Sequence, residues 1–226
     1  MKVFMPNLTL TIGQAKITPL FWGLIIAFVI SSFSFWRRLR EDYKEEEIFG
    51  LTLFISGGSL FLSWASVFLF SSSQFFFPLA FLGAVLAVRL WSMRFKVNIW
   101  EVFDALSLPF LFFLLFGGIG SFLSSGSVWD WRYIGVSFLG FGAWKFSRRR
   151  YRSFSWYKSG KIGFLFWEVS LVVFLLLSVL AFFEENTLYF EVLILTTMTL
   201  LSAVIIYYRA ERNLREDWRN ILKWRK

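Results

Sequence analysis

The chain has 226 residues, of which 57% are hydrophobic, 22% aromatic and 17% charged, and its formal net charge is +9. This composition is far more apolar than that of a soluble domain, and it predicts an integral membrane protein. The absence of histidine and cysteine from the sequence excludes Ser-His-Asp triads, thiol nucleophiles and disulfide bonds, and it removes the commonest metal ligands.

Seven apolar segments predict an all-α fold with about seven transmembrane helices. They cover residues 19–36, 48–70, 75–91, 102–116, 133–146, 162–183 and 188–208. The first segment is followed by Arg37, Arg38 and Arg40 rather than preceded by cations, which favours a retained span over a cleaved signal peptide. We therefore expect residues 1–208 to form one polytopic membrane domain and residues 209–226 to form a basic tail.

Lysine and arginine residues are divided very unequally between alternate loops. Only Lys2, Lys16 and Arg132, of the 24 cations, lie in one set of loops. Cytoplasmic loops carry the excess of positive charge in membrane proteins. We therefore expect the amino terminus outside and the carboxy terminus inside a bacterial plasma (inner) membrane. Because the positive charge lies at helix ends, no nucleic-acid partner is expected.

The basic tail combines cations with Leu214, Trp218, Ile221 and Leu222 at helical spacing. This pattern predicts an amphipathic helix on the inner membrane surface, where anionic lipid head groups attract basic residues. Ordinary anchoring of the topology is an alternative to specific lipid recognition, because positive charge is expected at this face.

A glycine-rich segment without charge, residues 116–127, follows the fourth apolar segment. It contains Gly117, Gly118 and Gly120, and glycine weakens helices and permits close approach of another helix or a ligand. We predict that the fourth helix ends near Phe116 and that a turn or broken element follows. Irregular backbone at membrane depth must be buried in protein or reached by water, which makes this segment a candidate site near the outer face.

Two acidic residues, Glu101 and Asp104, lie three residues apart near the inner end of the fourth segment. This spacing places both carboxylates on one helix face. They act either as interfacial ion pairs with Arg94 or Lys96, or as acid–base groups. Charged residues within membrane segments are costly and often functional.

Two further acidic residues, Glu168 and Glu191, belong to the sixth and seventh segments. Glu168 has no cation in its own segment and follows Trp167. It therefore needs a buried partner or a proton, and it either makes a structural hydrogen bond to another helix or orients a ligand. Glu191 lies near the outer interface, where we expect it to be solvated.

Four groups of residues follow the order of motifs in a known family. The opening group is Ile12, Gly13, Ile17, Trp22, Gly23 and Leu24, and a second group runs from Gly83 to Arg89 with Arg94. The longest group is Asp104, Pro109, Gly117, Gly118, Ile119, Gly120, Ser121, Phe122, Leu123 and Ser124, and a late pair is Trp167 and Glu168. In these residues the chain resembles the prolipoprotein diacylglyceryl transferases of bacterial inner membranes.

The resemblance implies a protein with seven spans that binds membrane phospholipid. Members of this family move the diacylglyceryl group of phosphatidylglycerol to the cysteine of a lipoprotein precursor. By this resemblance the lipid-binding residues are Trp22, Gly117, Gly118, Gly120, Ser121, Ser124 and Glu168, and the catalytic candidates are Glu168 and Asp104. The sequence contains no phosphate-loop or dinucleotide motif, and neither a cofactor nor a metal is expected.

The chain departs from the family where the family's chemistry is concentrated. Gly118 stands in place of the signature arginine, and Ser121 and Ser124 stand in place of its two asparagines. A glycine offers a phosphate only a backbone N–H, whereas arginine forms two parallel hydrogen bonds. We expect a transferase-like protein that handles phospholipid and transfers poorly or not at all. The alternatives are an active enzyme with a rearranged site, and a non-enzymatic membrane subunit or small transporter.

Overall fold

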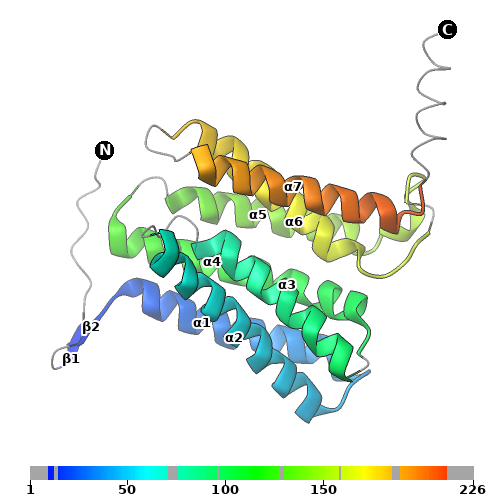
Figure 1. Cartoon of the computed structure of the whole chain (residues 1–226), viewed down its shortest axis with the longest axis horizontal. Coiled ribbons are helices and arrows are strands. Elements are labelled where there is room, and N and C mark those ends of the chain that lie inside the picture. The colour runs from blue at the N-terminus through cyan, green and yellow to red at the C-terminus, as the bar shows by residue number, and fades with distance from the viewer. Residues whose placement is uncertain are drawn as a thin grey trace, which may run out of the picture.

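The computed structural model describes residues 10–12, 15–70, 76–95, 97–127, 130–157, 159–184 and 189–212. A small antiparallel hairpin comes first, with β1 (Leu10–Ile12) paired to β2 (Ala15–Ile17). Within the described residues, the long helices are α1 (Pro19–Leu39), α2 (Glu45–Phe70), α3 (Phe76–Phe95), α4 (Ile99–Ser125), α5 (Trp131–Ser147), α6 (Phe164–Phe182) and α7 (Tyr189–Arg209). A one-turn 3-10 helix, Tyr151–Ser153, lies between α5 and α6. The fold is helical as predicted, apart from the small hairpin (Figure 1).

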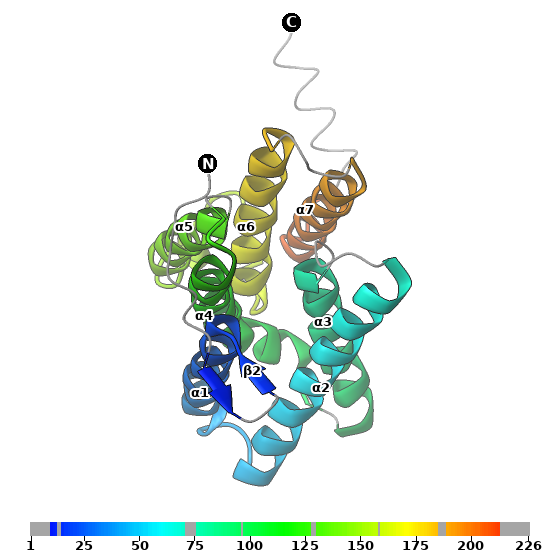
Figure 2. The same ribbon diagram turned by 90° about the vertical axis from the view of Figure 1, so that its left-hand side faces the viewer.

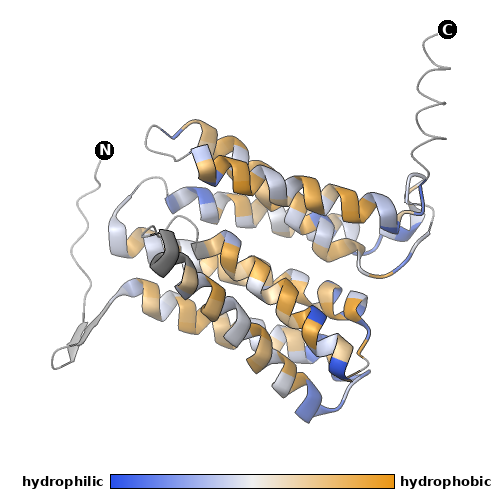
Figure 3. Ribbon diagram, viewed as in Figure 1, coloured by the Kyte–Doolittle hydropathy of each residue, from blue (hydrophilic) through white to orange (hydrophobic). Residues whose placement is uncertain are grey.

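In the part of the chain that the structure describes, six helices are long and apolar enough to cross a membrane: Pro19–Leu39, Glu45–Ala65, Phe77–Phe95, Ile99–Ser125, Phe164–Phe182 and Tyr189–Arg209. Hydrophobic residues predominate along the helices, and hydrophilic residues gather near their ends (Figure 3). The chain is therefore a multi-pass membrane protein. Helix α5 has 17 residues, about 25 Å at 1.5 Å per residue and shorter than the hydrocarbon core of about 30 Å. A seventh span formed by α5 stays a prediction.

Helix ends meet at two ends of the bundle. At one end, which we call the Arg132 end, the start of α5 contacts the segment that follows α6 and the start of α7 through Arg132, Glu184 and Glu191. At the other end, which we call the basic end, Arg209 of α7 packs on the Trp100 ring of α4 at 4.1 Å. The last turns of α1, α3, α5 and α7 contribute cations to the basic end.

Aromatic residues join the helices at the centre of the bundle. Viewed along the helices in Figure 2, α1, α4 and α5 lie on one side, and α2, α3 and α7 lie on the other. Phe81 of α3 stacks on Phe166 of α6, with ring centroids 5.5 Å apart, and contacts Phe110 of α4 at 5.2 Å. Burial of these large rings contributes to the packing between the two sides.

Helix α4 differs from the prediction at its carboxyl end. The predicted end near Phe116 is wrong, because the helix continues through Gly117, Gly118 and Gly120 to Ser125. It ends at Gly126, whose φ of 63° is the left-handed conformation that favours glycine. The glycines remain helical because neighbouring helices pack against them, which outweighs the low helix propensity of glycine.

Candidate functional site

The glycine-rich segment brings α4 and α1 into direct backbone contact. A Cβ atom on Gly23 would lie 2.6 Å from the carbonyl oxygen of Phe116 and 3.1 Å from the Cα of Gly120. A Cβ on Gly120 would in turn lie 2.9 Å from the Cα of Leu20. The backbone N–H of Leu20 donates a hydrogen bond to Ser124 Oγ at 2.9 Å. We call these residues, Leu20, Gly23, Phe116, Gly120 and Ser124, the α1–α4 junction.

The junction unites two groups of residues that carry the family resemblance, although they are about one hundred positions apart. Ser124 supplies an acceptor to an N–H in the first turn of α1, which lacks an intrahelical partner by geometry. Glycine at positions 23 and 120 permits the close approach of the two helices. The segment predicted as a broken loop is therefore a helix–helix contact.

The other predicted lipid-binding residues near this segment have different environments. Gly118 is buried against α5, where an added Cβ would lie 2.8 Å from the Cβ of Tyr133. Gly117 and Ser121 are half-buried, and a Cβ on Gly117 would meet only a Leu24 methyl at 3.9 Å. The Trp22 side chain is 47% exposed at the surface of α1. Trp22 is thus the member of this group with the most surface available to a lipid.

Asp104 caps the amino terminus of a neighbouring helix. Its Oδ2 accepts the N–H of Gly163 at 2.7 Å, and its Oδ1 accepts the N–H of Leu165 at 2.9 Å and that of Phe166 at 3.4 Å. Gly163 has a φ of 98°, which permits the chain to turn sharply into α6. A carboxylate at this place satisfies N–H groups that have no intrahelical partner and complements the helix dipole. Both oxygens of Asp104 are therefore engaged in structure.

Glu101 and Asp104 share a face of α4 but have separate partners. Glu101 accepts a hydrogen bond from the Tyr43 hydroxyl at 2.9 Å, and the Tyr43 oxygen also accepts the N–H of Asn98 at 3.3 Å. Burial, followed by the hydrogen bond to Glu101, raises the pKa of Tyr43 to about 12. Within the described residues, the recorded ion pairs do not include Glu101 or Asp104, so the expected pairing with Arg94 is not observed.

Glu168 makes a hydrogen bond to another helix, which was one of the two roles predicted for it. Its Oε1 accepts a hydrogen bond from Ser147 Oγ of α5 at 2.5 Å. Its Oε2 is buried and has no hydrogen-bond partner among the described residues. Nearby on α5, Trp144 Nε1 donates to Ser107 Oγ of α4 at 3.1 Å. This polar network ties α5 to α4 and α6 near the basic end.

The two halves of the predicted site lie far apart. Asp104 contacts the first turn of α6, the helix that carries Glu168. Gly118 lies fourteen residues beyond Asp104 on α4, about 21 Å along a helix. Glu168 therefore lies toward the basic end, whereas Gly118, Gly120 and Ser124 lie toward the Arg132 end.

The expectation that Glu191 is solvated is wrong. Its side chain is only 3% exposed and its Oε1 accepts a hydrogen bond from Arg132 at 3.1 Å. Arg132 also pairs with Glu184 at 2.6 Å and donates to the Tyr133 hydroxyl at 3.0 Å. No role for Arg132 was predicted, although it is one of the few cations in its set of loops. The scarcity of cations in these loops could have indicated a role for Arg132, because an acidic residue buried at the same end needs a positively charged partner.

Several sequence predictions fall outside the described residues. They include the amphipathic helix predicted from Leu214 to Leu222, the residue Gly13 of the opening group, and Lys96 as a partner of Glu101.

No family model, no curated protein and no solved structure matches the chain. The suggested relation to the diacylglyceryl transferases accordingly rests on the resemblance in the sequence.

Proposed function

We propose that the chain is a transferase-like membrane protein that handles phospholipid, phosphatidylglycerol in particular, at the α1–α4 junction. The observation that carries the proposal is the contact of Gly23 and Leu20 with Gly120 and Ser124. Gly23 belongs to one, and Gly120 and Ser124 to another, of the groups that resemble motifs of prolipoprotein diacylglyceryl transferases, and Leu20 lies one turn before Gly23 on α1. Their meeting at one end of the bundle supports a shared scaffold, with Trp22 exposed beside them as the lipid contact.

Transfer of the diacylglyceryl group is not the activity that these contacts favour. Gly118 cannot offer a guanidinium to a phosphate, and its face of α4 is filled by Tyr133 of α5. Asp104 is occupied by three backbone N–H groups. Glu168 lies toward the opposite end from Ser124. We accordingly propose lipid binding with slow or absent transfer.

The proposed orientation follows from the charge of the two ends. The basic end would face the cytoplasm of a bacterial cell, because positively charged loops are retained on that side. The α1–α4 junction would then lie in the outer leaflet of the plasma membrane. A lipoprotein precursor would approach from that side.

An assay of binding and transfer tests the proposal. The full-length protein is incubated with phosphatidylglycerol and a peptide that carries a lipoprotein cysteine motif, with an established transferase of the resembled family as the positive control. We expect bound phosphatidylglycerol to co-purify with the protein and the peptide to remain almost unmodified. Modification at a rate comparable to the control, or the absence of any phosphatidylglycerol preference over phosphatidylcholine, would contradict the proposal.

A second candidate function is that of a membrane subunit that packs against another membrane protein. The observation that favours it is Gly57, an exposed glycine on α2 where an added Cβ would meet nothing within 4 Å. Large apolar residues surround this position, including Leu53 and Phe61, which are 51% and 66% exposed. Small residues on a lipid-facing helix allow a partner helix to approach. Recovery of one partner in a fixed ratio, lost in a Gly57→Leu variant, would support this function over lipid handling.

A further inference from the structure

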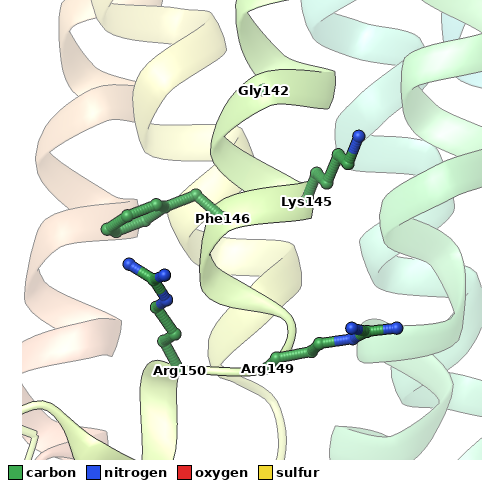
Figure 4. A pocket seen from close by; sticks show the side chains of 5 residues that line it. All are labelled: Gly142, Lys145, Phe146, Arg149 and Arg150. Carbon is green, nitrogen blue, oxygen red and sulfur yellow. The ribbon is translucent and has the colours of Figure 1, made fainter.

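The carboxyl end of α5 carries a surface depression lined by cations. Its volume is about 360 Å³, and its lining residues are Gly142, Lys145, Phe146, Arg149 and Arg150 (Figure 4). We call this feature the basic depression. All five residues are exposed. The depression lies at the basic end, away from the α1–α4 junction.

The positive charge in this part of the chain lacks a nearby acidic counterpart in the sequence. No aspartate or glutamate occurs between Asp130 and Glu168. The ion pairs recorded among the described residues do not include Lys145, Arg149 or Arg150. Lys145 and Arg149 are four residues apart and extend to the same side of the helix (Figure 4). Like charges at this spacing repel each other, and a bound anion would relieve the repulsion.

The third cation of the depression is held beside an aromatic ring. The guanidinium carbon of Arg150 lies 5.0 Å from the centroid of the Phe146 ring. This cation–π contact positions the charge without neutralising it. The Phe146 side chain is 57% exposed, so the depression presents an apolar surface directly beside its positive charge.

The apolar surface continues along the exposed face of α5. This face consists of Gly135, Phe138, Leu139, Gly142 and Phe146, which share one side of the helix by their spacing. Phe138 and Leu139 are 62% and 58% exposed. An added Cβ at Gly135 or at Gly142 would meet nothing within 4 Å. The two glycines add no side chain to this face, and Gly142 lines the basic depression.

We infer that the basic depression binds the phosphate group of an anionic phospholipid, with one acyl chain lying along the exposed face of α5. A phosphate matches the charge of Lys145 and Arg149, which extend to the same side, whereas Arg150 extends to the opposite side beside Phe146 (Figure 4). Arginine is well suited to bind phosphate oxygens. An acyl chain would cover the exposed apolar face of α5, whereas a soluble phosphate compound would leave that face uncovered. Clusters of lysine and arginine directly beside a membrane helix bind anionic lipid head groups. The site is separate from the α1–α4 junction and does not depend on the proposed function.

Lipid titration of the full-length protein in detergent, followed by native mass spectrometry, tests this inference. The probes are dioleoylphosphatidic acid and dioleoylphosphatidylcholine, which have the same acyl chains. We expect phosphatidic acid to bind about tenfold more tightly. Phosphatidic acid lacks the glycerol head group of phosphatidylglycerol, so this result is independent of the transferase-like function. Inorganic phosphate and glycerol 3-phosphate are added as competitors, and we expect neither to displace the lipid.

Three variants locate the binding. The double variant Lys145→Gln and Arg149→Gln should bind phosphatidic acid about tenfold more weakly, because two cations near the head group are removed. The matched control is Arg148→Gln with Arg152→Gln, which removes the same charge from residues that pack on Trp144 and Tyr151 outside the depression. This control should bind nearly as tightly as the unaltered protein. Gly142→Leu fills the depression without changing its charge and should also weaken binding.

The outcomes distinguish a specific lipid-binding site from nonspecific attraction between the anionic lipid and the positive charge of the protein. Equal losses in the two double variants would overturn the inference in favour of diffuse electrostatics. Unchanged affinity in Gly142→Leu would also overturn it, since nothing lies within 4 Å of the added Cβ and the helix is expected to fold. Displacement of the lipid by inorganic phosphate or glycerol 3-phosphate would show a soluble ligand instead. Thermal unfolding of each variant checks that the loss of binding is not a loss of structure.

Discussion

At the scale of single residues, the intramembrane carboxylates of this chain are mainly bonded to other helices. Asp104 accepts hydrogen bonds from three backbone N–H groups at the start of α6, and Glu168 accepts one from a hydroxyl of α5. Hydrogen bonds to a charged group contribute more to stability than those between neutral groups. The sequence indicated that these residues matter, but their partners lie on other helices, at separations that local spacing does not reveal.

The cap formed by Asp104 should be a large contribution to stability. We expect Asp104→Ala to lower the free energy of unfolding by about 3 kcal/mol, because it leaves the start of α6 without its acceptor. Asp104→Asn should have a smaller effect, since the amide oxygen still accepts from one N–H. The matched control is Glu101→Gln, one turn earlier on α4, with a single hydrogen bond from Tyr43. Chemical unfolding in detergent measures all three, and equal effects of Asp104→Ala and Glu101→Gln would contradict the role of the cap.

Tyr43 should make stability depend on pH in alkaline solution. Its pKa in the folded protein is raised to about 12, above the value of about 10 for an unperturbed tyrosine. The folded state therefore keeps its proton while the unfolded state loses it. The contribution of Tyr43 is complete below pH 10 and is lost as the pH rises toward 12. Thermal unfolding temperatures at several pH values should fall more steeply for the unaltered protein than for Tyr43→Phe, and parallel curves would exclude this explanation.

At the scale of elements, the glycine-rich segment shows how packing overrides propensity. Three glycines near one another predicted a break in α4, yet the helix runs to Ser125. Gly120 faces the backbone of α1 and Gly118 faces α5, so each is needed for a close contact. Periodicity located the apolar helices well, with α5 and α7 starting and ending within two residues of the predicted bounds. Close contacts between helices could not be derived, because they depend on partners far away in the sequence.

Two glycines of this segment should therefore respond in opposite ways to the same substitution. Gly120→Ala places a Cβ 2.9 Å from the Leu20 Cα and 3.0 Å from the Pro19 carbonyl oxygen. Because these are backbone atoms, α1 must shift, and we expect a loss of about 2 kcal/mol in unfolding free energy. Gly117→Ala meets only a methyl group at 3.9 Å and should be neutral or stabilising by up to about 1 kcal/mol. Unfolding curves of the two variants provide the comparison, and similar losses would argue against the packing at the junction.

At the scale of the whole molecule, the polar side chains of the two ends have distinct roles. At the Arg132 end, one buried arginine pairs with Glu184 and Glu191 and so joins α5 to the segment that follows α6 and to α7. At the basic end, exposed cations accumulate and one group of them surrounds a depression. The division of charge between ends was evident in the sequence. The pairing of Arg132 was not, because its two partners lie 52 and 59 positions away.

The central claim is that phosphatidylglycerol contacts the α1–α4 junction, and cross-linking tests it most directly. Phosphatidylglycerol with a photoreactive acyl chain is bound to the full-length protein, irradiated, and the labelled peptides are identified by mass spectrometry. We predict labels within residues 19–24 and 117–124. Labelling should be reduced in Trp22→Ala but retained in Phe33→Ala, the control, because Phe33 is a similarly exposed residue on the same helix. Labels confined to α5, or spread evenly over the lipid-facing helices and unaffected by Trp22→Ala, would contradict the account.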